Sequence, residues 1–323
     1  MVLWTQDLTK EFDGITAVDG VDFSLEAGEL CSVIGPNGAG KTTFFNLLTG
    51  VLEPTRGQIE FMPTTHRRAC LERALEESSE LADEHGSVDD LEAALDGDTL
   101  PNEAVAEWLE PLDITDASPH ETALQGLHRS YQITNVFPTV SVLENVRVAV
   151  QAHRGNDAWR FWRNVNAFDD HYTEAEAILE RVGLASYADR LAQNLSHGEK
   201  RNLEIGIALA GEPDVLLLDE PTAGVSSEDV DQVTDIIEDV AGDYAVMLIE
   251  HNMDVVMDIS DRIAVLNRGE LIEQGEPAQI RQSEAVQQAY LGGYDGEGAL
   301  GGGEATDGGE DKGGADHTSE VAG

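Results

Sequence analysis

Residues 35–43 read Gly35-Pro36-Asn37-Gly38-Ala39-Gly40-Lys41-Thr42-Thr43 and constrain the fold more than any other run of the chain. A short apolar run, 30–34, precedes them, and a helix-like stretch that stops at Gly50 follows. Glycines at these positions let successive backbone N–H groups converge on phosphate oxygens, and the N-terminus of the next helix adds a favourable field. The pattern G-x-x-x-x-G-K-[ST] therefore predicts a strand, a phosphate-binding loop and a helix.

Two side chains of this loop suit a bound nucleoside triphosphate. Lys41 is expected to reach the β- and γ-phosphates, and the Thr42 hydroxyl is expected to coordinate Mg²⁺. Phosphate loops occur in many kinases and GTPases, so the pattern alone predicts nucleotide binding and no particular reaction.

A second apolar run, 215–218, ends in the adjacent carboxylates Asp219 and Glu220. Successive side chains of a strand point in different directions, so one carboxylate can hold the Mg²⁺ shell while the other faces an attacking water. We expect Asp219 on the metal side and Glu220 as the general base.

The fold class follows from the spacing of the apolar runs. Residues 215–218, 245–249 and 263–266 are short and apolar throughout, as expected for strands buried on both faces of a parallel sheet. Between the first two lies a helix pattern with the start signal Ser226-x-x-Asp229. Strand, crossover helix and strand in this order predict an α/β protein.

The charge of the chain excludes some partners. Among 323 residues, 63 are acidic and 19 are basic, which gives a net charge of −44. Nucleic acid needs a basic footprint, so we expect no nucleic-acid partner. Acid spread along the whole chain is typical of proteins that work in molar intracellular salt, where self-repulsion is screened. No apolar run is long enough to span a membrane, so a cytoplasmic location is expected.

Two segments differ in composition from the rest. Residues 63–110 are rich in acid with apolar side chains at helical spacing, and they predict one or two amphipathic helices and a shorter one around 105–109. This segment reads as a solvated insertion, or alternatively as a surface that docks a partner or regulates the protein. Residues 294–323 are glycine and acid with almost no large apolar side chain, which predicts a disordered tail.

The run Asn194-Leu195-Ser196-His197-Gly198-Glu199 narrows the family. It resembles the signature L-S-G-G-Q of ATP-binding cassette (ABC) proteins, although His197 and Glu199 depart from the commonest letters. The resemblance implies a P-loop cassette with a mostly parallel central sheet, a small antiparallel β subdomain and a helical signature subdomain at 136–211. It also implies that ATP is the nucleotide, and that Ser196 and the Gly198 backbone bind the γ-phosphate of an ATP held by a second subunit.

Further positions match those that the family uses. Phe12 stands where an aromatic stacks on adenine, although taken alone it would more often be a core residue. Gln132 matches a glutamine that touches metal and water, and His251 matches a switch histidine that contacts the γ-phosphate, with a polar cap as the alternative. Many members have Asp or Asn at Ser226, so this residue is instead expected to cap the following helix.

Within the family the sequence most resembles the ATP-binding subunits of branched-chain amino-acid importers, through residues 41–50, 249–253 and 275–292. Urea and short-amide importers share most of these letters, and lipid-exporter ATPases share the ending Tyr290-Leu291-Gly292. A lipid or polysaccharide exporter therefore stays an alternative. A soluble cassette protein acting on ribosomes or DNA would need two cassettes, coiled coils or a basic face, which the sequence lacks.

The resemblance also implies the domain organisation and the partners. The nucleotide-binding domain is expected at 1–293, interrupted by the insertion 63–110 and followed by the tail. The partners are a second ATPase subunit, permease subunits that hold the chain at the inner face of the membrane and, indirectly, a solute-binding protein.

Overall fold

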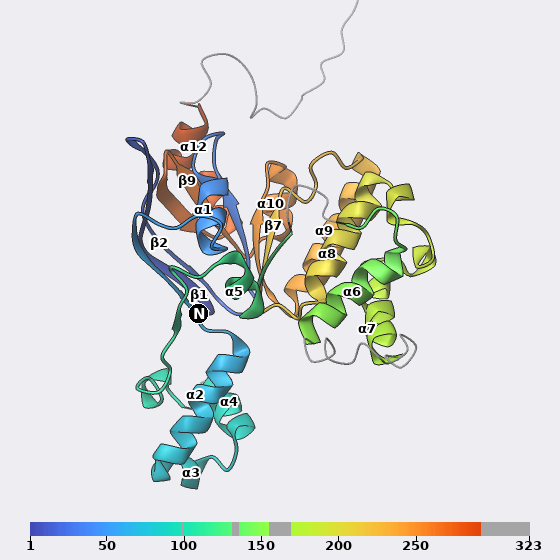
Figure 1. Cartoon of the computed structure of the whole chain (residues 1–323). Helices are drawn as coiled ribbons and strands as arrows, with labels where there is room; N and C mark the ends of the chain where they lie inside the picture. Colours follow the sequence, from blue (N-terminus) through green and yellow to red (C-terminus); the bar gives the residue numbers. More distant parts are fainter. Residues whose placement is uncertain (98–99, 131–135, 155–168, 292–323) are drawn as a thin grey trace, which may run out of the picture.

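The computed structural model describes residues 1–97, 100–130, 136–154 and 169–291. Figure 1 shows two sheets next to each other, a group of helices to one side and a further helical group at one end. Gln132 and residues 294–323 lie outside the described ranges.

The larger sheet has the strand order β10-β9-β3-β8-β7-β6. Its strands β3, β6, β7, β8 and β9 pair in parallel, and β10 pairs with β9 in the antiparallel sense. Their bounds are β3 (Leu30–Ile34), β6 (Leu127–Ser130), β7 (Val215–Asp219), β8 (Ala245–Ile249), β9 (Arg262–Asn267) and β10 (Glu270–Gly275). The expected mostly parallel sheet is confirmed.

Alternate side chains of β7 and β8 enter two different cores, which explains why residues 215–218 and 245–249 are apolar at every position. Val215 and Leu217 of β7 belong to one buried cluster, whereas Leu216 and Leu218 belong to the other. A strand covered on both faces disfavours a polar side chain before its end, unless a buried partner satisfies it as Ser260 does for Ser32 of β3. The first polar side chain of β7 is therefore that of Asp219, at the carboxyl edge of the sheet.

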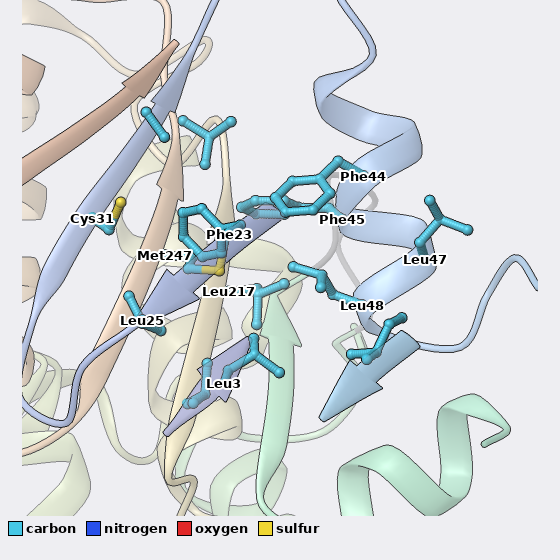
Figure 2. Close-up of a cluster of buried hydrophobic side chains, with 14 of the residues drawn as sticks. Leu3, Phe23, Leu25, Cys31, Phe44, Phe45, Leu47, Leu48, Leu217 and Met247 are labelled. Atoms are coloured by element: carbon cyan, nitrogen blue, oxygen red, sulfur yellow. The ribbon is translucent and has the colours of Figure 1, made fainter. Parts of the chain in front are cut away.

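Helices cover both faces of this sheet. On one face α1 (Lys41–Leu48) directs Phe44, Phe45 and Leu48 toward Leu217 and Met247 (Figure 2). The other face is covered by a group of helices, of which α8 and α9 lie next to the strands. The remaining bounds are α5 (Pro119–Leu124), α6 (Val142–Arg154), α7 (Asp169–Arg181), α8 (His197–Leu209), α9 (Ser227–Ala241), α10 (Met253–Ile259), α11 (Pro277–Gln282) and α12 (Glu284–Leu291), with 3-10 helices Ala185–Tyr187 and Ala192–Asn194.

The smaller sheet is antiparallel, with the strand order β2-β1-β4-β5. Its strands are β1 (Leu3–Phe12), β2 (Ile15–Leu25), β4 (Arg56–Phe61) and β5 (Leu112–Asp113). Phe23 of β2 meets Phe44 edge to face, with the ring centroids 5.6 Å apart, so this sheet packs on the same core as α1. The expected small antiparallel subdomain is confirmed.

A helical group separates β4 from β5. It contains α2 (Thr64–Glu77), α3 (Ser79–Glu84) and α4 (Val88–Asp96), and it projects away from the two sheets (Figure 1). Its apolar side chains form a cluster of their own around Leu71, Leu91 and Val105. Thr64 ties the group to the larger sheet, because its backbone N–H donates to Asp214 Oδ1 at 2.9 Å.

The prediction of a short helix around 105–109 is wrong. The structure has a 3-10 helix, Asn102–Ala104, followed by turns. The N–H groups of Trp108 and Leu109 both donate to the carbonyl of Val105, so only one turn closes before Pro111. A single turn does not offset the cost of helix nucleation, and proline supplies no further N–H. The apolar spacing of residues 105–109 instead reflects the burial of Val105 in the apolar cluster that it shares with Leu71 and Leu91.

Within the described residues, none of the helices combines the length and the apolar character that crossing a bilayer requires.

Candidate functional site

The loop 35–43 connects β3 to α1, as predicted. Gly40 is the N-cap of α1 with a φ of 102°, and a Cβ atom there would lie 2.3 Å from the carbonyl oxygen of Ala17. Only glycine suits this position, because a Cβ atom would clash with that carbonyl oxygen and other residues rarely adopt this φ. Gly40 has no side chain that could cap α1, so the first backbone N–H groups of this helix can bind an anion instead.

Lys41 is buried at the base of this loop, with 6% of its surface exposed. Its Nζ donates to the carbonyl oxygens of Gly35 at 2.6 Å and Pro36 at 3.2 Å. Burial lowers the pKa of the ammonium, whereas the nearby charges of Glu220 and Asp219 raise it. The structure therefore brings the predicted cation and both predicted carboxylates into one electrostatic environment.

Thr42 and Thr43 occupy the first turn of α1. Thr42 is exposed and Thr43 is partly buried. The oxygen donors of Thr42 and Asp219 are of the kind that Mg²⁺ prefers, so this pair of residues fits the predicted ion.

Asp219 is almost fully buried and forms an ion pair that the sequence alone does not predict. Nη2 of Arg129 lies 2.6 Å from Asp219 Oδ2, and the two side chains are 6% and 4% exposed. Nη1 of Arg129 also donates to Asn46 Oδ1 on α1 at 2.6 Å. Arg201 of α8 donates to the backbone carbonyl of Asp219. Asp219 is thus linked to α1, β6 and α8.

Glu220 and His251 follow the neighbouring parallel strands β7 and β8 and meet beyond their ends. The Nε2 atom of His251 lies 2.7 Å from Glu220 Oε1, and the two side chains are 46% and 24% exposed. Glu220 has a φ of 49°, a left-handed conformation that is uncommon outside glycine, so the extended backbone of β7 ends at this residue. The pairing was not predicted, although both residues were.

Ser196 and Gly198 lie at the start of α8. Ser196 is its N-cap, with a reciprocal capping box in which Ser196 Oγ accepts from the Glu199 N–H and Glu199 Oε2 accepts from the Ser196 N–H. Glu199, one of the two departures from the commonest signature letters, therefore has a structural role here. Both predicted residues lie in the helical part of the molecule, on a different element from the phosphate loop (Figure 1).

Phe12 is not a core residue. It ends β1, is 40% exposed, and has the Nζ of Lys10 5.2 Å from its ring centroid. Its neighbour across the hairpin, Ile15, is 70% exposed. The aromatic ring is therefore available for a contact outside the core.

Ser226 occupies the N-cap position of α9, as expected, but does not make the expected bond. Its Oγ donates to Asp229 Oδ2 at 2.7 Å rather than accepting from a backbone N–H. Ser87 and Ser118 also donate to the acidic residue three positions on, yet they accept its backbone N–H as well, so the bond to Asp229 does not by itself account for the missing cap bond.

Residues 18–223 match the model of the ABC transporter family. Over 299 residues the chain is 33% identical to the high-affinity branched-chain amino acid transport ATP-binding protein BraF of Pseudomonas aeruginosa, covering 90% of this chain and 98% of that protein. It is 25% identical over 292 residues to the lipopolysaccharide export system ATP-binding protein LptB of Haemophilus influenzae, with coverage of 90% and 97%.

The fold is similar to that of a solved structure, the ADP conformation of MJ1267, an ATP-binding cassette of an ABC transporter. The TM-score is 0.66 at 24% identity, and the match covers 90% of this chain and 98% of that one.

Proposed function

This chain belongs to the ABC transporter family and is its ATP-binding, ATP-hydrolysing subunit, and we propose that it powers the uptake of branched-chain amino acids or of a similar small polar solute. The observation that supports catalysis most directly is the pair Glu220–His251, at 2.7 Å, next to Lys41 and Asp219.

We assign the site residues as follows. The backbone of 35–43 and Lys41 hold the phosphates of ATP, and Phe12 stacks on the adenine. Mg²⁺, held by Thr42, Asp219 and Gln132, would neutralise charge on the β- and γ-phosphates. Gln132 lies outside the described residues, so its assignment depends on the sequence alone.

Hydrolysis is phosphoryl transfer to water. Glu220 orients the water and accepts its proton, and His251 holds Glu220 and contacts the γ-phosphate. In such a reaction positioning and charge stabilisation supply most of the rate enhancement. The hydrogen bond between the two side chains supports these roles, because it fixes the carboxylate that must face the water.

The complete site requires a second cassette. Ser196 and Gly198, at the start of α8, would contact the γ-phosphate of an ATP bound to that subunit, so that two ATP molecules lie between two chains. Closure with ATP and reopening after hydrolysis would then move the helical part against the sheets.

We propose that permease subunits receive this motion at the surface behind Gln132, and that they hold the chain at the inner face of the membrane. A hollow of about 280 Å³ lies between α5, β6 and α8, next to the strand that leads to Gln132. A solute-binding protein would act on the permease and not on this chain. No nucleic-acid partner is proposed, since the net charge is −44.

The similarity to BraF supports the importer assignment, and the similarity to LptB keeps an exporter of lipid or polysaccharide as the second candidate. The genes that lie beside this one distinguish the two. A binding protein for amino acids and two permeases support import, whereas genes of an export pathway contradict it.

We further propose that residues 1–293 form one cassette with 63–110 as an insertion and 294–323 as a solvated tail, and that the protein works in molar salt. Both proposals are supported by composition, and the first also by the separate apolar cluster of α2 to α4.

The variant Glu220→Gln tests the catalytic assignment. It removes the base and keeps the shape of the side chain, so turnover should fall about 10²- to 10⁴-fold. ATP binding should be retained, and an ATP-bound dimer should accumulate on a sizing column in molar KCl. Hydrolysis at the parent rate would show that Glu220 is not the base.

A further inference from the structure

Glu250, the residue between β8 and His251, has a buried carboxylate. Only 3% of its surface is exposed. Glutamate is almost never fully buried unless its charge is matched by hydrogen bonds or a counter-ion. The groups that surround this carboxylate therefore indicate what it does.

Each oxygen of this carboxylate accepts hydrogen bonds from a different loop. Oε1 accepts from the backbone N–H and the hydroxyl of Thr222, both at 2.7 Å, in the loop that follows β7. Oε2 accepts from the backbone N–H groups of His251 at 3.0 Å and Asn252 at 3.4 Å, after β8. Glu250 thus joins the loop that begins with Glu220 to the loop that begins with His251.

The same two loops carry the two halves of the candidate catalytic pair. Thr222 lies two residues after Glu220, and the N–H of Ala223 donates to the carbonyl of Glu220 at 3.1 Å, so the turn that includes Thr222 also sets the backbone of Glu220. His251 follows Glu250 directly. A shift of either loop would change the distance of 2.7 Å between the two side chains.

We propose that Glu250 is a positioning residue, which holds Glu220 and His251 together by bonding both loops at once. The inference rests on the proposed function, because it assigns a role in hydrolysis. Its chemical basis is that a carboxylate has two acceptor oxygens, whereas an amide of the same shape has one acceptor and one donor. Glutamine at this position can accept hydrogen bonds from one loop only. Its N–H₂ group would face the N–H donors of the other loop, which it cannot bond.

The test is the variant Glu250→Gln. Loss of alignment by about 1 Å can cost about 10²-fold in rate, so kcat should fall at least 10-fold while KM for ATP changes less than about 3-fold. Glu180→Gln, an exposed site on α7, removes the same charge and should keep the parent kcat. A parent-like kcat for Glu250→Gln would overturn the inference.

A double-mutant cycle separates positioning from mere stability. Because Glu250 also bonds the loop of Glu220, Glu250→Gln should lower kcat less in a chain that already carries His251→Ala than in the parent, although it lowers the melting temperature of both. Independent losses that multiply would contradict the proposal. If Glu250→Gln does not fold, the same cycle is run with Thr222→Val, which removes one donor to Oε1 and leaves the other.

The proposed function can fail separately. Glu220→Gln is measured alongside, and full activity of that variant would reject the catalytic assignment itself. An inactive Glu220→Gln together with a fully active Glu250→Gln would reject only the role of Glu250.

Discussion

Arg129 and Asp219 face each other from the adjacent parallel strands β6 and β7, with their charged atoms 2.6 Å apart and both side chains less than a tenth exposed. Arg129 also reaches Asn46 on α1, and its guanidinium lies 5.7 Å from the ring of Phe45. Arg129 thus connects the helix of the phosphate loop to the carboxylate that we assign to Mg²⁺, and it does so from the strand that leads to Gln132.

Replacing Arg129 by methionine should destabilise the protein strongly. The change leaves the buried Asp219 carboxylate without its cation, which typically costs about 3 to 5 kcal/mol. Denaturant unfolding in molar KCl measures the loss. The control is Arg56→Met, since the ion pairs of Arg56 with Asp7 and Asp19 are exposed and should be worth about 1 kcal/mol or less. Equal losses for both variants would contradict the importance of the buried pair.

Replacing His251 by alanine should reduce turnover more than binding. The imidazole lies 2.7 Å from Glu220, and in the proposed mechanism it also contacts the γ-phosphate, so we expect kcat to fall about 10²-fold or more. The phosphate loop and Lys41 are unchanged, so the dissociation constant of a fluorescent ATP analogue should stay within about 3-fold of the parent. A variant that binds poorly and turns over normally once saturated would place His251 in ground-state binding instead.

Local patterns predicted most of the fold because they are set by near neighbours. The phosphate loop, the apolar run of β7 and the carboxylates at its end all depend on spacing along the chain. Arg129 and Glu250 were missed as functional residues because their partners come from distant parts of the sequence. Arg129 meets Asp219 across 90 positions, and Glu250 meets Thr222 across 28. The signal for Glu250 was present in the sequence, as a charged residue at the end of an otherwise apolar strand.

The helical group between β4 and β5 should be removable. Phe61 and Leu112 are direct antiparallel partners, so a two-residue Asn-Gly turn can replace 62–111 and close the hairpin. Because α2 to α4 pack on their own cluster, ATP hydrolysis and coupled transport should match the parent in the assembled transporter.

The matched variant for this deletion keeps the segment and weakens its core. Leu91→Ala, at a fully buried position, should destabilise the helical group by about 2 to 5 kcal/mol and leave turnover intact. Normal basal hydrolysis with lost transport in either variant would support the alternative, that this group docks a partner or regulates the dimer.

Salt should stabilise the fold, and the exposed acidic side of α9 offers a site to test this, although Arg181 already pairs with Asp239 there. Asp235 is exposed there, with Asp231 four residues before it and Asp239 four residues after. Like charges at this spacing destabilise a helix by about 0.2 to 0.5 kcal/mol per pair at low salt, and the pair Asp231–Asp235 carries this penalty because Asp239 is paired with Arg181. The Debye length falls from about 10 Å at 0.1 M to about 3 Å at 1 M, which removes most of this repulsion. Asp235→Asn should therefore raise the unfolding free energy in dilute buffer and leave it nearly unchanged in 2 M KCl. If the parent is equally stable in both buffers, or if the variant gains the same stability in both, the protein is not adapted to molar salt through its surface charge.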